Sequence, residues 1–277
     1  MALRARGSAR IAEQGAGHVS PPLVGVVDWR LPVRGGAAVE LAGRIGADGV
    51  QLDLGGPGRG ERLDGPGRLG RIREASCRAG VAVLAVAVNA MNDIGLMSGD
   101  AAVRSTLLRA LDAAGALGAG LVFVPSFRRS AIDGTAALRS TAEVLRWAAA
   151  EAAARGLLLA SENVLDSRQA RAMATAVGSD SFRLLLDTYN LVAAGGDPVR
   201  LVSAVPELLA DQIHVKDGPG GDASRVLAAV ARSGTDVGAL VLENDHRDDD
   251  AARLRRDLAR LRRYAARFTD APNSEEF

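Results

Sequence analysis

The sequence predicts an α/β protein of the (β/α)8 TIM-barrel class. From residue 23 onward, eight short apolar runs alternate with eight longer amphipathic segments. The short runs are nearly continuous in Val, Leu, Ile and Ala, which is typical of parallel strands that are covered on both faces. A strand begins every 25–40 residues, and eight such units in about 250 residues match a closed barrel.

The short apolar runs define the expected strands. In chain order, these strands are residues 23–29, 49–54, 81–88, 119–125, 157–163, 183–187, 211–217 and 238–245.

The segments between the strands carry apolar residues at helical spacing. In chain order, the expected helices are residues 37–47, 66–79, 100–118, 135–156, 167–177, 198–206, 222–234 and 251–268. Gly80 and Gly156 stand where a helix C-cap commonly falls. Cys77 lies in the second helix, where a packed small hydrophobe is the preferred interpretation over a nucleophile.

An open, doubly wound sheet is the other arrangement that such units can form. The stretch after the first strand, "VVDWRLPVRGG", lacks the G-x-G-x-x-G fingerprint of dinucleotide-binding sheets. The stretch "GGPGRGERLDGPG" after the second strand is rich in glycine but runs into a loop rather than directly into a helix. We interpret it as a turn-rich loop instead of a phosphate cradle, and the closed barrel is preferred.

The barrel is expected to form one domain over residues 21–268. Residues 1–20, which include His18, are predicted to be a flexible extension, and residues 269–277 a flexible tail. The first segment contains arginines but no apolar stretch of the signal-peptide type. No apolar run approaches the length that spans a membrane, so no membrane association is expected.

Composition excludes some classes of partner. The chain has 34 Lys and Arg against 33 Asp and Glu, a formal charge of +1, and 3% aromatic residues. These values argue against phosphate-backbone neutralisation and base stacking, so nucleic acid is not expected as a partner. The single cysteine excludes an internal disulfide and a cysteine-based zinc site, and it fits a reducing cytoplasm.

Four consecutive expected strands end in, or carry, one ionisable group each. These groups are separated by 25, 27 and 29 residues, and they are Glu162, Asp187, His214 and Glu243. In a barrel of this class the chemistry takes place at the carboxyl ends of the strands. The four side chains are therefore expected to meet at the same rim.

Three carboxylates that follow buried apolar runs would repel one another unless a cation lies between them. A mostly oxygen ligand set with one imidazole suits a single divalent ion, with Mn²⁺ preferred, Mg²⁺ or Co²⁺ also suitable, and Zn²⁺ left open. Taken singly, each acid reads more simply as a helix cap or surface charge, and the histidine as a packed core residue. The series on four neighbouring strands favours the metal site.

The strand ends resemble those of a known family. The segments "SEN", "LLLDTYN", "IHVKD" and "LEND" are similar to those of the xylose isomerase-like barrels, which include sugar-phosphate isomerases, ketose 3-epimerases, inosose dehydratases and endonuclease IV. The resemblance extends from about Leu23 to Phe268. It implies that the four residues bind one divalent cation, and that Glu162 and Glu243 also act as the acid/base pair.

The sequence departs from that family at three positions. Many members carry a histidine where Asn190 stands, some dehydratases carry one at Val164, and ketohexose epimerases carry an arginine at Gly220. A standard ketohexose substrate is therefore not expected. Endonuclease IV is excluded because its three-zinc site needs more histidines than His18, His214 and His246 supply.

The resemblance implies a metal-dependent isomerase or epimerase of a sugar-like polyhydroxy carbonyl compound. A metal-bound carbonyl acidifies the neighbouring C–H, one glutamate removes that proton, and the other returns one. Loss of a leaving group instead gives a dehydratase or lyase of the keto-cyclitol, dehydroshikimate or C-glycoside type. A non-catalytic metal-binding subunit or ligand-binding barrel is the alternative from another class. Barrels of this family often associate, so a homo-oligomer is an open expectation.

Further polar residues at the strand ends are candidates for substrate contacts. Lys216 shares a face with His214 and is expected either to bind an anionic group or the enolate, or to pair with a rim carboxylate. The other candidates for substrate binding are Asn190, Asn89, Asp53, Gln51 and Arg128, although a solvated loop position is the preferred interpretation for Arg128 and Arg129. Asn163 and His246 adjoin ligands and are candidates to support them, with an exposed loop position as the alternative for His246.

Overall fold

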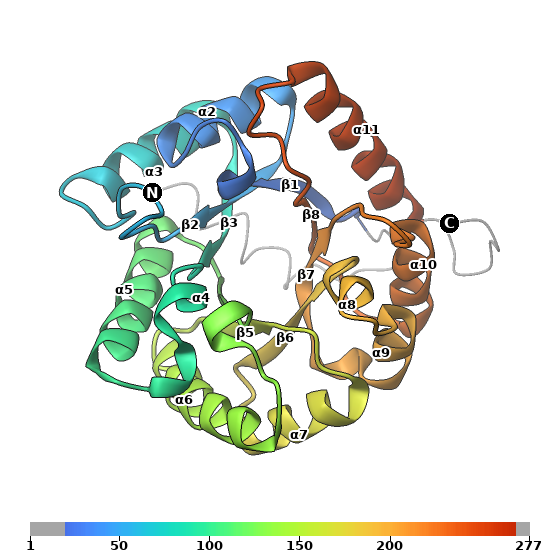
Figure 1. Cartoon of the computed structure of the whole chain (residues 1–277). Coiled ribbons are helices and arrows are strands. Elements are labelled where there is room, and N and C mark those ends of the chain that lie inside the picture. Colours follow the sequence, from blue (N-terminus) through green and yellow to red (C-terminus); the bar gives the residue numbers. More distant parts are fainter. Residues whose placement is uncertain (1–19, 270–277) are drawn as a thin grey trace, which may run out of the picture.

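The computed structural model describes residues 20–269, and in this part of the chain eight parallel strands close into a barrel inside a ring of helices (Figure 1). Each strand pairs with the next along the chain, and the last pairs with the first. The strands are β1 Leu23–Val27, β2 Gly49–Asp53, β3 Ala82–Ala87, β4 Leu121–Pro125, β5 Leu158–Glu162, β6 Phe182–Asp187, β7 Leu209–Val215 and β8 Ala239–Leu242. The predicted fold class is confirmed.

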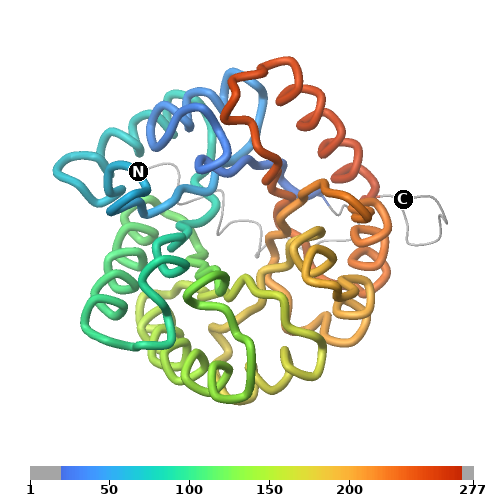
Figure 2. The backbone as a smooth tube through the Cα atoms, in the orientation of Figure 1, coloured from blue at the N-terminus to red at the C-terminus, as the bar shows by residue number. Residues whose placement is uncertain are grey.

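The helices of the outer ring connect successive strands, as the backbone path in Figure 2 shows. The longer ones are α2 Gly36–Ile45, α3 Arg68–Ala79, α5 Ala101–Leu117, α6 Thr135–Ala153, α7 Ser167–Val177, α9 Pro198–Ala204, α10 Ala223–Ser233 and α11 Ala251–Arg267. Each corresponds to one predicted helix. One-turn helices that the sequence did not indicate are η2 Asp28–Arg30, α4 Met91–Ile94, η3 Leu96–Ser98, η4 Arg128–Ser130, α8 Asn190–Ala193 and η5 Pro206–Leu208.

Capping residues determine where α7 begins after β5 and where α3 ends. Asp166 accepts the backbone N–H of Gln169 at 2.8 Å, and the Gln169 side chain accepts the backbone N–H of Asp166 at 3.0 Å. This reciprocal cap at Asp166 lies four residues after Glu162, and α7 begins at the next residue. Gly80 ends α3 with a positive φ of 65°, which glycine adopts without a steric penalty, so the C-cap predicted there is confirmed.

The barrel interior is filled by side chains at every second residue of the strands. Its apolar members are Val27, Trp29, Leu84, Ala85, Ala87, Leu121, Phe123, Ala160, Leu185, Ala210, Ala239 and Val241. The intervening strand residues pack outward against the helices in the larger core cluster. All four candidate ligands continue the inward series: Glu162, Asp187 and Glu243 each follow an inward residue by two positions, and His214 follows the inward residue Ala210 by four.

A bulge in β3 affects the packing inside the barrel. The register of β2 with β3 pairs Val50 with Val83 and Gln51 with Ala85, so Leu84 is an extra residue. A Cβ on Gly25 or Gly49 would lie within 2.6 Å or 2.5 Å of the Leu84 side chain. A larger residue at either position would therefore displace the Leu84 side chain.

Cys77 is exposed, and the prediction that it packs as a small hydrophobe is wrong. The buried face of α3 is formed by Ile72 and Ala75. Cys77 lies five residues after Ile72, and at 100° per residue this places it well off that face.

No helix between residues 20 and 269 is long and apolar enough to cross a membrane. Residues 1–20, with His18, and residues 269–277 were predicted to be flexible. Except for positions 20 and 269, they lie outside the described residues.

Candidate metal centre

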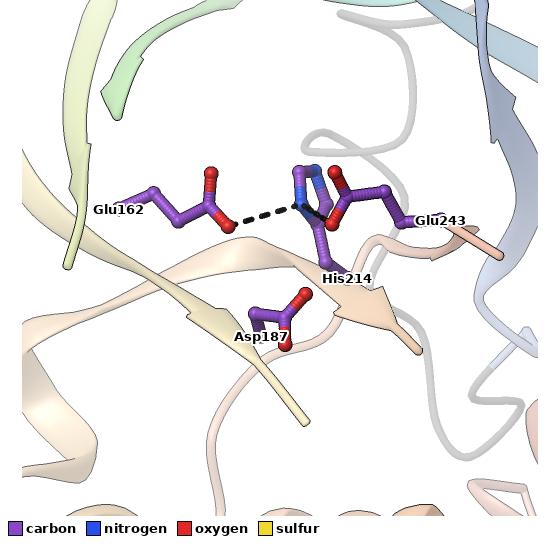
Figure 3. A group of neighbouring side chains, drawn as sticks. All are labelled: Glu162, Asp187, His214 and Glu243. Atoms are coloured by element: carbon purple, nitrogen blue, oxygen red, sulfur yellow. Dashed lines mark ion pairs between the residues drawn. The ribbon is translucent and has the colours of Figure 1, made fainter. Parts of the chain in front are cut away.

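Glu162, Asp187, His214 and Glu243 converge at the carboxyl end of the barrel (Figure 3). Each offers one ligand atom, and these atoms all lie within 4.8 Å of one another. All four residues are buried, and none is more than 5% exposed. Glu162 and Glu243 approach from opposite sides of the His214 ring, and Asp187 lies below them in the view of Figure 3.

Three of the four candidate ligands each have a buried polar atom that lacks a hydrogen bond to any residue that the structure describes. Asp187 Oδ2, His214 Nδ1 and Glu243 Oε2 are buried and have no hydrogen-bond partner among residues 20–269. His214 Nδ1 lies 3.5 Å from Glu243 Oε2 and 3.8 Å from Glu162 Oε1. Because buried polar atoms are almost always satisfied, unpaired lone pairs that point at one spot fit a divalent cation there.

The electrostatics of the group favour a cation as well. Burial, together with the charges of Glu243 and Glu162, raises the pKa of Asp187 to about 8. Burial acts to lower the pKa of His214, but the two glutamates outweigh it and raise that pKa to about 10. Both shifts favour the form of the side chain that carries a proton, and a divalent ion would compensate the negative charges of the carboxylates in the same way.

A chain of hydrogen bonds determines which nitrogen of His214 faces the site. The Gln212 amide N–H donates to the Leu84 carbonyl at 3.0 Å, so its oxygen accepts the Gln51 amide N–H at 2.9 Å. The remaining Gln51 Oε1 lies 2.7 Å from His214 Nε2 and can only accept. In its neutral form His214 therefore carries its one proton on Nε2, which leaves the Nδ1 lone pair for a metal ion.

Gln51 is thus a partner of the histidine, and the prediction that it binds a substrate hydroxyl is wrong. The side chain is 0% exposed, and both ends of its amide are used within the barrel. The bulge at Leu84 supplies the carbonyl that begins the chain of bonds.

Replacing Gln51 with Leu is expected to weaken metal binding by roughly 10- to 100-fold, because the orientation and protonation of His214 are then no longer held. Titration of the metal-free protein with Mn²⁺ by calorimetry measures the change. Gln169→Leu makes the same substitution at the cap of α7 and should bind Mn²⁺ as the wild type does. Equal affinity of the wild type and Gln51→Leu would refute the role of the hydrogen-bond chain.

Glu243 is surrounded by donors from η2, which follows β1, and from the residue that follows β7. Trp29 Nε1 donates to Glu243 Oε1 at 3.0 Å, Arg30 Nε lies 3.7 Å from the same oxygen, and Lys216 Nζ lies 3.6 Å from Oε2. Burial acts to raise the pKa of Glu243, but His214 and Lys216 hold it below its usual range. Trp29 and Arg30 were not among the predicted site residues, although strand alternation from Val27 places Trp29 on the inward face.

Glu162 has a different neighbour. Asn190 Nδ2 donates to Glu162 Oε1 at 2.7 Å, and Asn190 Oδ1 accepts from Lys216 Nζ at 3.1 Å. Asp187 Oδ1 accepts the backbone N–H of Asn190 at 2.6 Å, which holds the start of α8 beside the site. Lys216 therefore forms the predicted ion pair with a rim carboxylate and is linked through Asn190 to the second glutamate.

Two predicted supports of the ligands are engaged elsewhere. Asn163 hydrogen-bonds with Ser161 Oγ and with the backbone N–H of Leu165, both at 3.1 Å. His246 is 2% exposed, so the exposed-loop alternative is wrong, and its Nε2 lies 3.3 Å from Asp257 Oδ2.

Arg128 lies on the rim with a mostly exposed side chain and pairs with Asp93 at 2.7 Å. This agrees with a solvated loop arginine. Asp53 and Asn89, by contrast, are buried at the mouth of the barrel.

Comparison with known proteins gives the family. Residues 39–264 match the family model described as xylose isomerase-like TIM barrel. The chain is 51% identical over 254 residues to 2-epi-5-epi-valiolone 7-phosphate 2-epimerase from Actinoplanes sp. (strain SE50/110), a match that covers 87% of this chain and 94% of that protein. This relative supports the predicted enzyme class of isomerases and epimerases.

Solved structures share the fold at low sequence identity. A xylose isomerase domain protein from Planctomyces limnophilus has a TM-score of 0.72 and 16% identity, over 90% of this chain and 100% of that one. A 3-keto-D-glucoside 4-epimerase from E. coli has a TM-score of 0.67 and 18% identity, over 87% and 99%. The protein belongs to the xylose isomerase-like TIM-barrel family.

Proposed function

We propose that this protein is a divalent-metal-dependent epimerase of a phosphorylated polyhydroxy ketone. The observation that carries the proposal is the position of two buried carboxylates, Glu162 and Glu243, on either side of His214 within the candidate metal-binding group (Figure 3). Inversion of a carbon centre requires a proton to leave one face and another to arrive at the opposite face. The relative's name denotes a phosphorylated ketone that is inverted at carbon 2, which supports this substrate class.

The four residues would hold the ion through Glu162 and Glu243 oxygens, Asp187 Oδ2 and His214 Nδ1. When bound, a divalent ion supplies polarisation of the ketone, with Mn²⁺ the ion we expect and Mg²⁺, Co²⁺ or Zn²⁺ as substitutes. One glutamate removes the proton from the carbon next to the ketone, and the C–H electron pair moves toward the carbonyl oxygen. The other glutamate delivers a proton to the opposite face, so a new C–H bond forms and the composition of the substrate is unchanged.

Lys216 and Asn190, at the rim of the barrel, assist the proton transfers to and from the substrate. The Lys216 ammonium lies 3.6 Å from Glu243 and 3.1 Å from Asn190 Oδ1, so its charge is close to where negative charge develops. Asn190 stands where many relatives carry a histidine and cannot transfer a proton at neutral pH. Its bond to Glu162 orients that carboxylate, which gives the residue a role in a working enzyme and argues against a non-catalytic subunit.

The test is to incubate the Mn²⁺-loaded protein with 2-epi-5-epi-valiolone 7-phosphate and follow the product by NMR. We expect a product of unchanged mass that is inverted at the carbon next to the ketone. A product that has lost water would identify a dehydratase. The absence of any change with this ketone and with a panel of ketose phosphates would identify a binding protein instead.

We place the activity in the cytoplasm, because a chain with one cysteine forms no internal disulfide.

A further inference from the structure

Asp53 and Asn89 line the half of the barrel mouth that carries none of the four candidate ligands. Asp53 follows the inward residue Gln51 on β2, and Asn89 follows the inward residue Ala87 at the end of β3, so both continue the inward series. The ligands come from β5 to β8, which occupy the other part of the barrel in Figure 1. The pair and the candidate metal position therefore lie on different parts of the same end of the barrel.

Both side chains are buried and incompletely bonded. Asp53 is 5% exposed and Asn89 is 8% exposed. Asp53 Oδ2 and Asn89 Nδ2 have no hydrogen-bond partner in the described part of the chain. Arg34 Nη1 lies 3.8 Å from Asp53 Oδ2, which is too far for a hydrogen bond. Since leaving such groups unpaired is costly, a ligand that satisfies both is the simplest explanation.

The backbone around the pair is held in place. Asp28 is buried, and its carboxylate accepts the backbone N–H of Asp53 and that of Gly35, both at 3.0 Å. The Asn89 backbone N–H donates to Asp53 Oδ1 at 3.3 Å. The backbone of both residues and the Asp53 carboxylate therefore have a fixed position before any ligand arrives, which is the arrangement expected of a binding subsite.

We propose that Asp53 and Asn89 bind a hydroxyl group of the substrate that is remote from the reacting carbon, and that they select polyhydroxylated ketones. A carboxylate oxygen accepts a hydrogen bond and an amide N–H donates one, while a hydroxyl group does both. This inference rests on the proposed function for the identity of the substrate, but the subsite itself requires only a polyol.

Sorbitol 6-phosphate tests the subsite without catalysis, because it has hydroxyls and a phosphate but no carbonyl. Calorimetry on the Mn²⁺-loaded full-length protein should give a Kd that rises roughly 10- to 100-fold in Asp53→Asn and in Asn89→Leu. The metal stoichiometry and Tm of both variants should match the wild type, which separates loss of binding from misfolding. Asp112→Asn removes the same charge from an exposed side chain paired with Arg155 and should leave the Kd unchanged.

A kinetic measurement with the ketone phosphate completes the test. KM should rise in Asp53→Asn with kcat within about threefold, because a contact far from the reacting carbon acts equally in ground and transition states. Failure of the wild type to bind sorbitol 6-phosphate, or equal binding by both variants and the wild type, would overturn the subsite. Binding that depends on Asp53 in a protein without epimerase activity would overturn the proposed function and leave the subsite standing.

Discussion

Glu162→Gln and Glu243→Gln are each expected to lower kcat for epimerisation by roughly 10²- to 10⁴-fold, the usual contribution of a positioned acid or base. Each substitution keeps an oxygen that can bind the metal ion but removes the group that exchanges a proton. NMR assays at saturating substrate measure the loss, and metal analysis shows whether the ion is retained. Its retention would assign the effect to proton transfer.

Glu207→Gln is the matched control, because Glu207 is exposed and pairs with Arg171 at 2.8 Å. This variant should have the activity of the wild type. A Glu162→Gln or Glu243→Gln protein that retains its metal and more than about a third of wild-type kcat would contradict the assignment of that glutamate, since a lost base costs far more.

Removing the metal ion with EDTA is expected to abolish activity and to lower Tm by on the order of 10 °C. Binding at a thousandfold excess over Kd stabilises the native state by about 4 kcal/mol, and each kcal/mol shifts Tm by about 2–4 °C in a domain of this size. Differential scanning fluorimetry before and after Mn²⁺ is added back measures the shift.

The Asp187→Asn variant shows whether the Tm response to EDTA depends on the charge of Asp187. Asparagine retains the oxygen that accepts the backbone N–H groups of Tyr189 and Asn190, so α8 should remain in place. It removes the charge that the cation would neutralise, and the Tm of this variant should respond little to EDTA. A wild-type Tm that is insensitive to EDTA would contradict the metal site.

The barrel and the four ligands could be predicted because both depend on repetition along the chain. One ionisable residue at the end of each of four consecutive strands is a pattern that strand alternation and barrel closure bring together without knowledge of side-chain packing. The bounds of the strands differ from the predicted ones by no more than three residues, as for β8, which ends at Leu242.

The partners of the ligands could not be predicted in the same way. The role of Gln51 depends on the bulge at Leu84, which leaves a carbonyl for Gln212 and thereby turns the Gln51 oxygen toward His214. Such a shift of register has no signal in the sequence. The helix α8 was missed because four residues are too few to show a helical period, yet it carries Asn190 against Glu162.

The most direct test of the account is the fate of solvent deuterium when each epimer is incubated separately in D₂O with the Mn²⁺-loaded wild type, Glu162→Gln and Glu243→Gln. We predict that the wild type places deuterium at the inverted carbon, and that each variant at most exchanges that hydrogen in one epimer, a different one for each variant, without inversion. The account would be contradicted by a product that carries no deuterium. It would also be contradicted if both variants exchanged the hydrogen of both epimers at the wild-type rate, because Glu162 and Glu243 would then not be the groups that remove and deliver the proton.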